Sequence, residues 1–145
     1  MSERRTGIGR RSGLRNSILD SYAVLAFLFH EKGSEKIREL LEKAAASDKV
    51  LFITAPNWAE VRYIIERKVG ATGWRETRTK LLGLPITIVP ADQALAEIAG
   101  EIKVLGKMSL ADCFAVALAK QKKADVYTGD PEFRAVEKDV KVVRL

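Results

Sequence analysis

A short apolar segment that ends on an acid, with a helical pattern directly behind it, constrains this chain most. The segment is Ile18-Leu19-Asp20, and apolar residues at helical spacing follow at once. If Ile18 and Leu19 lie in a buried strand, Asp20 stands at the carboxyl end of that strand. In open α/β sheets, ligands bind in the crevice outside this end of the strands. The sequence therefore predicts that Asp20 lies at the mouth of a binding site.

Strand and helix patterns alternate along the rest of the chain. Short apolar runs bounded by polar residues or prolines predict strands at 18–19, 50–53, 85–89, 126–128 and 140–143. Apolar residues at helical spacing predict helices at 24–29, 34–45, 56–70, 74–82, 91–105, 109–121 and 131–136. This alternation predicts one α/β domain, with a parallel central sheet of about five strands and helices on both faces.

The positive charge is concentrated at the beginning of the chain. The net charge is +6, and residues 1–15 contain five arginines and one acid, which gives +4. We expect residues 1–15 to form a basic flexible extension and residues 16–145 to form the folded domain. Arginines outside the fold can bind nucleic-acid phosphates, and they can equally act as a solubilising tail.

The remaining composition is that of a globular protein of the cytoplasm. Hydrophobic residues make up 47% of the chain and charged residues 30%, without a signature of disorder. The longest uncharged apolar run, 22–29, has eight residues, whereas about 20 are needed to cross a bilayer. The single cysteine, Cys113, excludes an intramolecular disulfide and a cysteine metal cluster. We therefore expect a cytoplasmic protein without membrane association.

Three further acids, Glu60, Asp112 and Asp130, stand at predicted strand ends or helix starts, as Asp20 does. Each acid taken alone also fits a helix cap, and Asn57-x-x-Glu60 has the spacing of a capping box. Taken together, the four acids meet at one end of the sheet, where close carboxylates repel and raise each other's pKa values. A hard dication removes this repulsion, and oxygen ligands without His or Cys suit Mg²⁺ or Mn²⁺.

The chemistry that this arrangement favours is metal-assisted cleavage of a phosphodiester bond. In such reactions the metal activates a water molecule and neutralises charge on the phosphate. The hydroxyl groups of Ser21 and Thr128 are candidates for direct or water-mediated contacts, and Ser109 is a third supporting residue. Glu132 is an additional candidate ligand.

Four segments together resemble the PIN-domain ribonucleases of the VapC toxin type. The segments are ILDSYA at 18–23, NWAEV at 57–61, SLAD at 109–112 and TGDPEF at 128–133. The resemblance carries the acidic quartet of the family onto Asp20, Glu60, Asp112 and Asp130. It also implies a PIN-like fold over residues 18–145, RNA cleavage with Mg²⁺ or Mn²⁺, a homodimer, and inhibition by a cognate antitoxin.

Two features depart from the family pattern. The family usually has a small hydroxyl residue two places after the first acid, where this chain has Tyr22. The family also commonly begins at its first strand, whereas a basic extension precedes that strand here. Two other functions of a PIN domain stay open, a housekeeping ribonuclease in rRNA processing and an inactive binding module. An Asp-x-Asp phosphatase is excluded, because Asp20-Ser21-Tyr22 lacks the second acid.

The two tryptophans are expected in different environments. Trp58 lies beside an apolar helix face, which favours a place in the core. Trp74 stands between Gly73 and Arg75, and it is the better candidate for a surface that binds RNA or a second copy of the chain.

Overall fold

Strand β1 (Ser17–Leu19) is the centre of a five-stranded parallel sheet in the order β3-β2-β1-β4-β5. In this computed structural model, which describes residues 15–145, β2 (Leu51–Thr54) and β3 (Ile86–Val89) lie on one side of β1. On the other side lie β4 (Asp125–Thr128) and β5 (Val142–Arg144). The predicted parallel sheet is confirmed, whereas the expectation for residues 1–14 falls outside the described residues.

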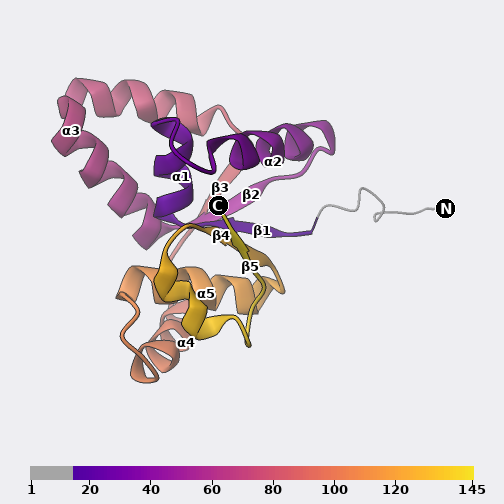
Figure 1. Cartoon of the computed structure of the whole chain (residues 1–145). Helices are drawn as coiled ribbons and strands as arrows, with labels where there is room; N and C mark the ends of the chain where they lie inside the picture. Colours follow the sequence, from indigo (N-terminus) through magenta and orange to yellow (C-terminus); the bar gives the residue numbers. More distant parts are fainter. Residues whose placement is uncertain (1–14) are drawn as a thin grey trace.

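The chain order of the strands reverses at β1. After β1 the chain adds β2 and β3 to one edge, and it later adds β4 and β5 to the opposite edge (Figure 1). All the pairings are parallel, so that the five strands end at the same edge of the sheet. The topological switch point therefore lies at the carboxyl end of β1, where open α/β sheets bind ligands.

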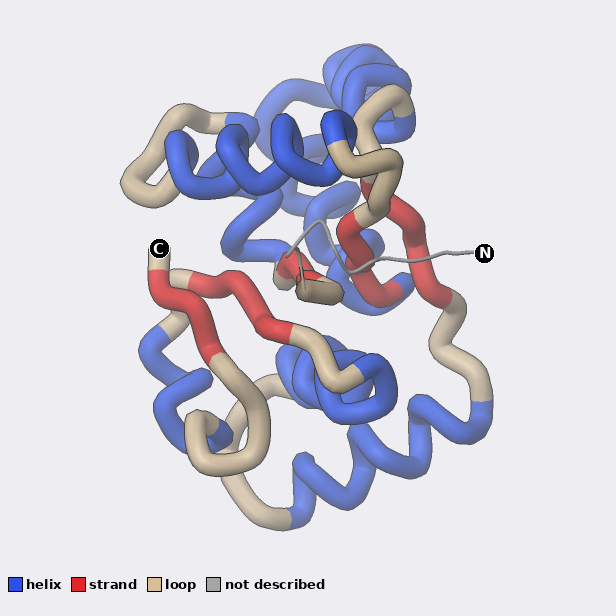
Figure 2. Tube along the Cα trace, turned by 90° about the vertical axis from the view of Figure 1, so that its right-hand side faces the viewer, coloured by secondary structure: helices blue, strands red, loops and turns tan. Residues whose placement is uncertain are grey.

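Helices cover both faces of the sheet (Figures 1 and 2). One layer consists of α1 (Ser21–Leu28), α2 (Ser34–Ala46) and α3 (Ala55–Leu82). The other consists of α4 (Gln93–Val104), α5 (Leu110–Lys122) and the 3-10 helix η1 (Pro131–Val136). Successive side chains of a strand point to opposite faces. Ile18 accordingly packs in the α4–α5 layer and Leu19 in the α1–α3 layer.

Helix α3 is bent at Gly70, where φ is 78° and ψ is 175°. The sequence predicts two helices here, and the structure joins two helical segments directly at this glycine, whose backbone conformation L-residues rarely adopt. The prediction that Trp74 lies on the surface is wrong, because its side chain is only 3% exposed. The bend brings Trp74 onto Trp58, with the ring centroids 5.5 Å apart in an edge-to-face arrangement.

A few element boundaries differ from those expected. The last strand covers Val142–Arg144 rather than 140–143. Helix α4 begins two residues later than expected, because Asp92 is its N-cap and accepts a hydrogen bond from the Leu95 N–H at 2.9 Å. Cys113 is buried, as expected. Within residues 15–145, every helix is too short or too polar to cross a membrane.

Candidate metal centre

One pocket at the carboxyl edge of the sheet brings the predicted acids together. Its walls include all four of them, Asp20, Glu60, Asp112 and Asp130. They reach the pocket from the end of β1, the second turn of α3, the first turn of α5 and the end of β4. Two of the three predicted hydroxyl residues, Ser21 and Ser109, also line the pocket. The third, Thr128, is fully buried and does not.

Asp20 is both a helix cap and a wall of the pocket. Its Oδ1 accepts a hydrogen bond from the Ala23 N–H at 2.8 Å and so caps α1. The side chain is almost fully buried, and burial raises its pKa to about 7. Repulsion by the carboxylates of Asp112 and Asp130 contributes to this rise, while hydrogen bonds from Thr128 and Ala23 oppose it. Capping and membership of an acidic cluster are therefore compatible in the same residue.

Thr128, a buried residue at the end of β4, positions two of the acids. It forms a side-chain hydrogen bond with Asp20, and its Oγ1 accepts a hydrogen bond from the Asp130 N–H at 2.9 Å. The Asp130 carbonyl in turn accepts a hydrogen bond from the Arg144 guanidinium at 2.6 Å. This threonine therefore holds the ends of β1 and β4 in register at the pocket.

A hydrogen-bond network fixes the side chain of Glu60, and the sequence alone did not predict it. Glu60 Oε1 accepts hydrogen bonds from the Ser21 hydroxyl at 2.8 Å and from the Asn57 side-chain amide at 3.1 Å. Asn57 is fully buried, and its Oδ1 accepts a hydrogen bond from the Thr54 hydroxyl at 2.9 Å. Both bonds to Glu60 end on Oε1, so that Oε2 is the oxygen left for a ligand in the pocket.

The suggested capping box at Asn57 and Glu60 is wrong. The N-cap of α3 is Thr54, whose hydroxyl accepts a hydrogen bond from the Asn57 N–H at 3.2 Å. The helix therefore begins three residues earlier than a cap at Asn57 requires, and Asn57 lies inside the first turn. The spacing Thr54-x-x-Asn57-x-x-Glu60 was the available signal, because residues three apart are neighbours on a helix.

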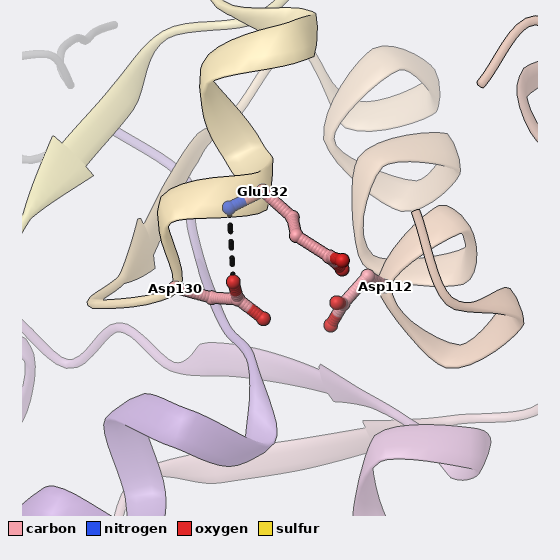
Figure 3. A group of neighbouring side chains, drawn as sticks. All are labelled: Asp112, Asp130 and Glu132. Carbon is pink, nitrogen blue, oxygen red and sulfur yellow. Dashed lines mark hydrogen bonds between the residues drawn. The ribbon is translucent and has the colours of Figure 1, made fainter. Parts of the chain in front are cut away.

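The tightest group of acids includes Glu132, which the sequence predicts as an additional ligand beside the four main acids. Carboxylate oxygens of Asp112, Asp130 and Glu132 all lie within 4.8 Å of one another (Figure 3). The Glu132 N–H donates a hydrogen bond to Asp130 Oδ1 at 2.9 Å, which makes Asp130 the cap of η1. Burial raises the pKa of Asp112 to about 7, and repulsion by Asp130, Glu60 and Glu132 adds to this effect.

This set of side chains fits a hard divalent cation. The pocket contains five carboxylates, those of Asp20, Glu60, Asp112, Asp130 and Glu132. Within residues 15–145, no Lys or Arg forms an ion pair with any of them. Their mutual repulsion and the burial of two of them are relieved when a cation binds, and oxygen ligands of this kind suit Mg²⁺ or Mn²⁺.

Comparison with known proteins agrees with this geometry. Residues 17–139, from the start of β1 to a point beyond η1, match the PIN domain. The chain belongs to the PIN-domain family. It is also 30% identical over 110 residues to Ribonuclease VapC of Mycolicibacterium smegmatis, across 71% of this chain and 82% of that protein. Within the PIN-domain family it is therefore a VapC-type ribonuclease, and the resemblance seen in the sequence is confirmed.

Two solved structures of toxin–antitoxin proteins share the fold. The DNA-bound VapBC of Salmonella typhimurium superposes with a TM-score of 0.70 at 14% identity, over 90% of this chain and 98% of that chain. A toxin–antitoxin complex from Klebsiella pneumoniae gives a TM-score of 0.64 at 20% identity, over 88% and 96% of the two chains. The five-stranded PIN fold is thus common to all three proteins.

Proposed function

We propose that this chain is a metal-dependent endoribonuclease, the toxin of a VapBC-type toxin–antitoxin module, and that it cleaves phosphodiester bonds of RNA. The observation that carries the proposal is the pocket of five carboxylates at the switch point of a PIN-family sheet. The VapC relative, which is a ribonuclease by name, supports RNA as the substrate.

We assign the binding of Mg²⁺ or Mn²⁺ to Asp112 and Asp130, with Asp20, Glu60 and Glu132 completing the acidic shell. When bound, the cation supplies activation of a water molecule and neutralisation of charge on the phosphate. Asp20 and Asp112, whose pKa values burial raises to about 7, give up any proton they hold when a cation enters. Glu60, fixed through Oε1, keeps Oε2 for the cation or for its water.

Purified protein should cut RNA in the presence of Mn²⁺ or Mg²⁺ and should stop when EDTA is added. Asp112→Asn should lose nearly all of this activity, because the change removes a charged oxygen ligand and keeps the shape of the side chain. Asp92→Asn is the matched control, since Asp92 is an exposed helix cap outside the pocket. If Asp112→Asn cuts RNA at the rate of the unmodified protein, the proposed metal site is wrong.

We further propose that the protein acts in the cytoplasm, forms a homodimer, and is held inactive by a cognate antitoxin. The toxin–antitoxin complex from Klebsiella pneumoniae, which has the same fold, supports a protein inhibitor. Coexpression with the product of a small neighbouring gene should yield a stable complex that no longer cuts RNA. If no such partner exists and cleavage is restricted to rRNA precursors, the chain is a housekeeping nuclease instead. Light scattering of the free protein tests the dimer.

A further inference from the structure

Tyr22 is an exposed aromatic side chain on the wall of the acidic pocket. It lines the pocket together with Asp20, Asp112 and Asp130, and 47% of the residue is exposed. It belongs to the first turn of α1, directly after the buried acid at the end of β1. One residue, Ser21, therefore separates an exposed aromatic residue from a buried carboxylate of the proposed metal centre.

The backbone of Gly129 lies directly against this ring. A Cβ atom on Gly129 would lie 2.3 Å from Cε1 of Tyr22, 2.7 Å from Cζ and 2.9 Å from Cδ1. The backbone of Gly129 is outside the left-handed region. A glycine is therefore required here because a larger side chain would clash with the Tyr22 ring, and not because of the backbone conformation. Because Gly129 directly precedes Asp130, its contact with the ring fixes Tyr22 relative to the acids. About half of Tyr22 stays open to solvent.

The charge of the pocket shows why such a ring is needed there. The five carboxylates repel the phosphates of an approaching RNA strand, and only the region close to a bound cation attracts them. An aromatic face binds a nucleobase without using charge, because every base has a face on which it can stack. Bases that are paired inside a helix are already stacked on their neighbours, whereas bases of a single strand are free to do so.

We propose that Tyr22 is a substrate-positioning residue, which stacks on a nucleobase beside the scissile phosphate of single-stranded RNA. This inference rests on the proposed ribonuclease function. The ring, held against Gly129, fixes one nucleotide and thereby the position of the neighbouring phosphate over the acids.

The first test is the kinetics of Mn²⁺-dependent cleavage of a labelled single-stranded RNA by three variants. Tyr22→Leu should lower kcat/KM about 5- to 100-fold, the range found when one stacked base loses its aromatic partner. Tyr22→Phe should stay within about twofold of the unmodified protein, because it keeps the ring. Tyr63→Leu is the matched control: Tyr63 is equally exposed, at 45%, but lies outside this pocket. All three variants should keep their melting temperature and their response to Mn²⁺.

The second test locates the stacked base. An abasic nucleotide is moved through the positions around the cleavage site, and kcat/KM is measured for each RNA. At one position the abasic substitution should slow the unmodified protein by the same factor as Tyr22→Leu, and it should have no further effect on that variant. If no position behaves in this way, or if Tyr22→Phe loses as much activity as Tyr22→Leu, Tyr22 does not stack on a base.

The two proposals fail in different ways. If the unmodified protein does not cut RNA with Mn²⁺ or Mg²⁺, the proposed ribonuclease function is wrong. If it cuts RNA and Tyr22→Leu cuts equally well at RNA concentrations below KM, the function stands and only the role of Tyr22 is refuted.

Discussion

Replacing Asp112 by Asn should stabilise the metal-free protein, by an amount that increases with pH. Burial, with repulsion from neighbouring acids, raises the pKa of Asp112 from an ordinary value of 3.8 to about 7. An acid with a higher pKa in the folded than in the unfolded state binds its proton more tightly when folded. The folded state therefore loses stability as the pH rises from about 4 through about 7, where the folded protein must at last ionise the buried group.

The size of the effect follows from this difference in pKa. A rise from 3.8 to about 7 corresponds to at most roughly 4 kcal/mol of unfolding free energy above pH 7 and at most roughly 2 kcal/mol at pH 5. Water in the pocket that Asp112 lines screens the charge and reduces both values. Asn is neutral at every pH and has nearly the same shape, so it escapes this penalty. The advantage of Asp112→Asn over the unmodified protein should be near zero at pH 4 and should reach its maximum above pH 7.

Urea unfolding in the presence of EDTA, at pH values from about 4 to about 8.5, measures this advantage. The fluorescence of the buried Trp74 reports on unfolding. Asp92→Asn is the control for the loss of one negative charge outside the pocket, and at pH 8 it should be no more stable than the unmodified protein. An advantage of Asp112→Asn that is equal at pH 5 and pH 8, or a variant that is less stable than the unmodified protein at pH 8, would show that ionised Asp112 does not destabilise the metal-free fold.

Three further predictions concern the cation, the Glu60 network and the basic extension. Millimolar Mn²⁺ should raise the melting temperature of the unmodified protein and leave that of the double variant Glu60→Gln, Asp112→Asn unchanged, because a cation stabilises only the state that binds it. Equal shifts in both proteins would show that these two acids do not hold the cation. Asn57→Ala should lower the unfolding free energy by about 1–3 kcal/mol, because it leaves the buried Thr54 hydroxyl without its acceptor. It should also slow RNA cleavage, because Glu60 loses the hydrogen bond from the Asn57 amide. An unchanged cleavage rate would show that Glu60 does not need this hydrogen bond. Deletion of residues 1–14 should leave the rate of RNA cleavage unchanged. It should reduce the slope of RNA affinity against salt concentration, because fewer counterions are released on binding. An unchanged slope would exclude RNA contact by the extension.

The architecture was predictable because its signals are local. Asp20 follows a buried apolar run, Asp130 precedes a helix, and the strands are short and continuous, so that each of these elements can be recognised from a few residues. The parallel arrangement then follows from the alternation of strands and helices. Once all strands end at one edge, the acids behind them must meet there, and the pocket contains all four that the sequence singled out.

The errors come from features that depend on how distant elements pack. Trp74 has a polar local sequence, and only the bend at Gly70 brings it into the core against Trp58. The role of Asn57 depends on whether the helix begins at Thr54 or three residues later, a boundary that propensities define poorly. The sequence contains many threonines and acids, and nothing in it shows how Thr128 and Glu132 lie relative to the main acids. The path of the chain after β4 buries Thr128 against Asp130 and brings Glu132 to Asp112 and Asp130.

The order in which the pocket is assembled has a consequence for the making of the protein. The acids come from opposite ends of the chain, because Asp20 follows β1 whereas Asp130 and Glu132 follow β4, which pairs directly with β1. During translation β1, β2 and β3 leave the ribosome first, yet the pocket cannot close until β4 has emerged and has found its place beside β1. The proposed nuclease should therefore be harmless to the messenger RNA and the ribosome that produce it until synthesis has passed Glu132. An antitoxin then has only the folded product to control, and never the growing chain.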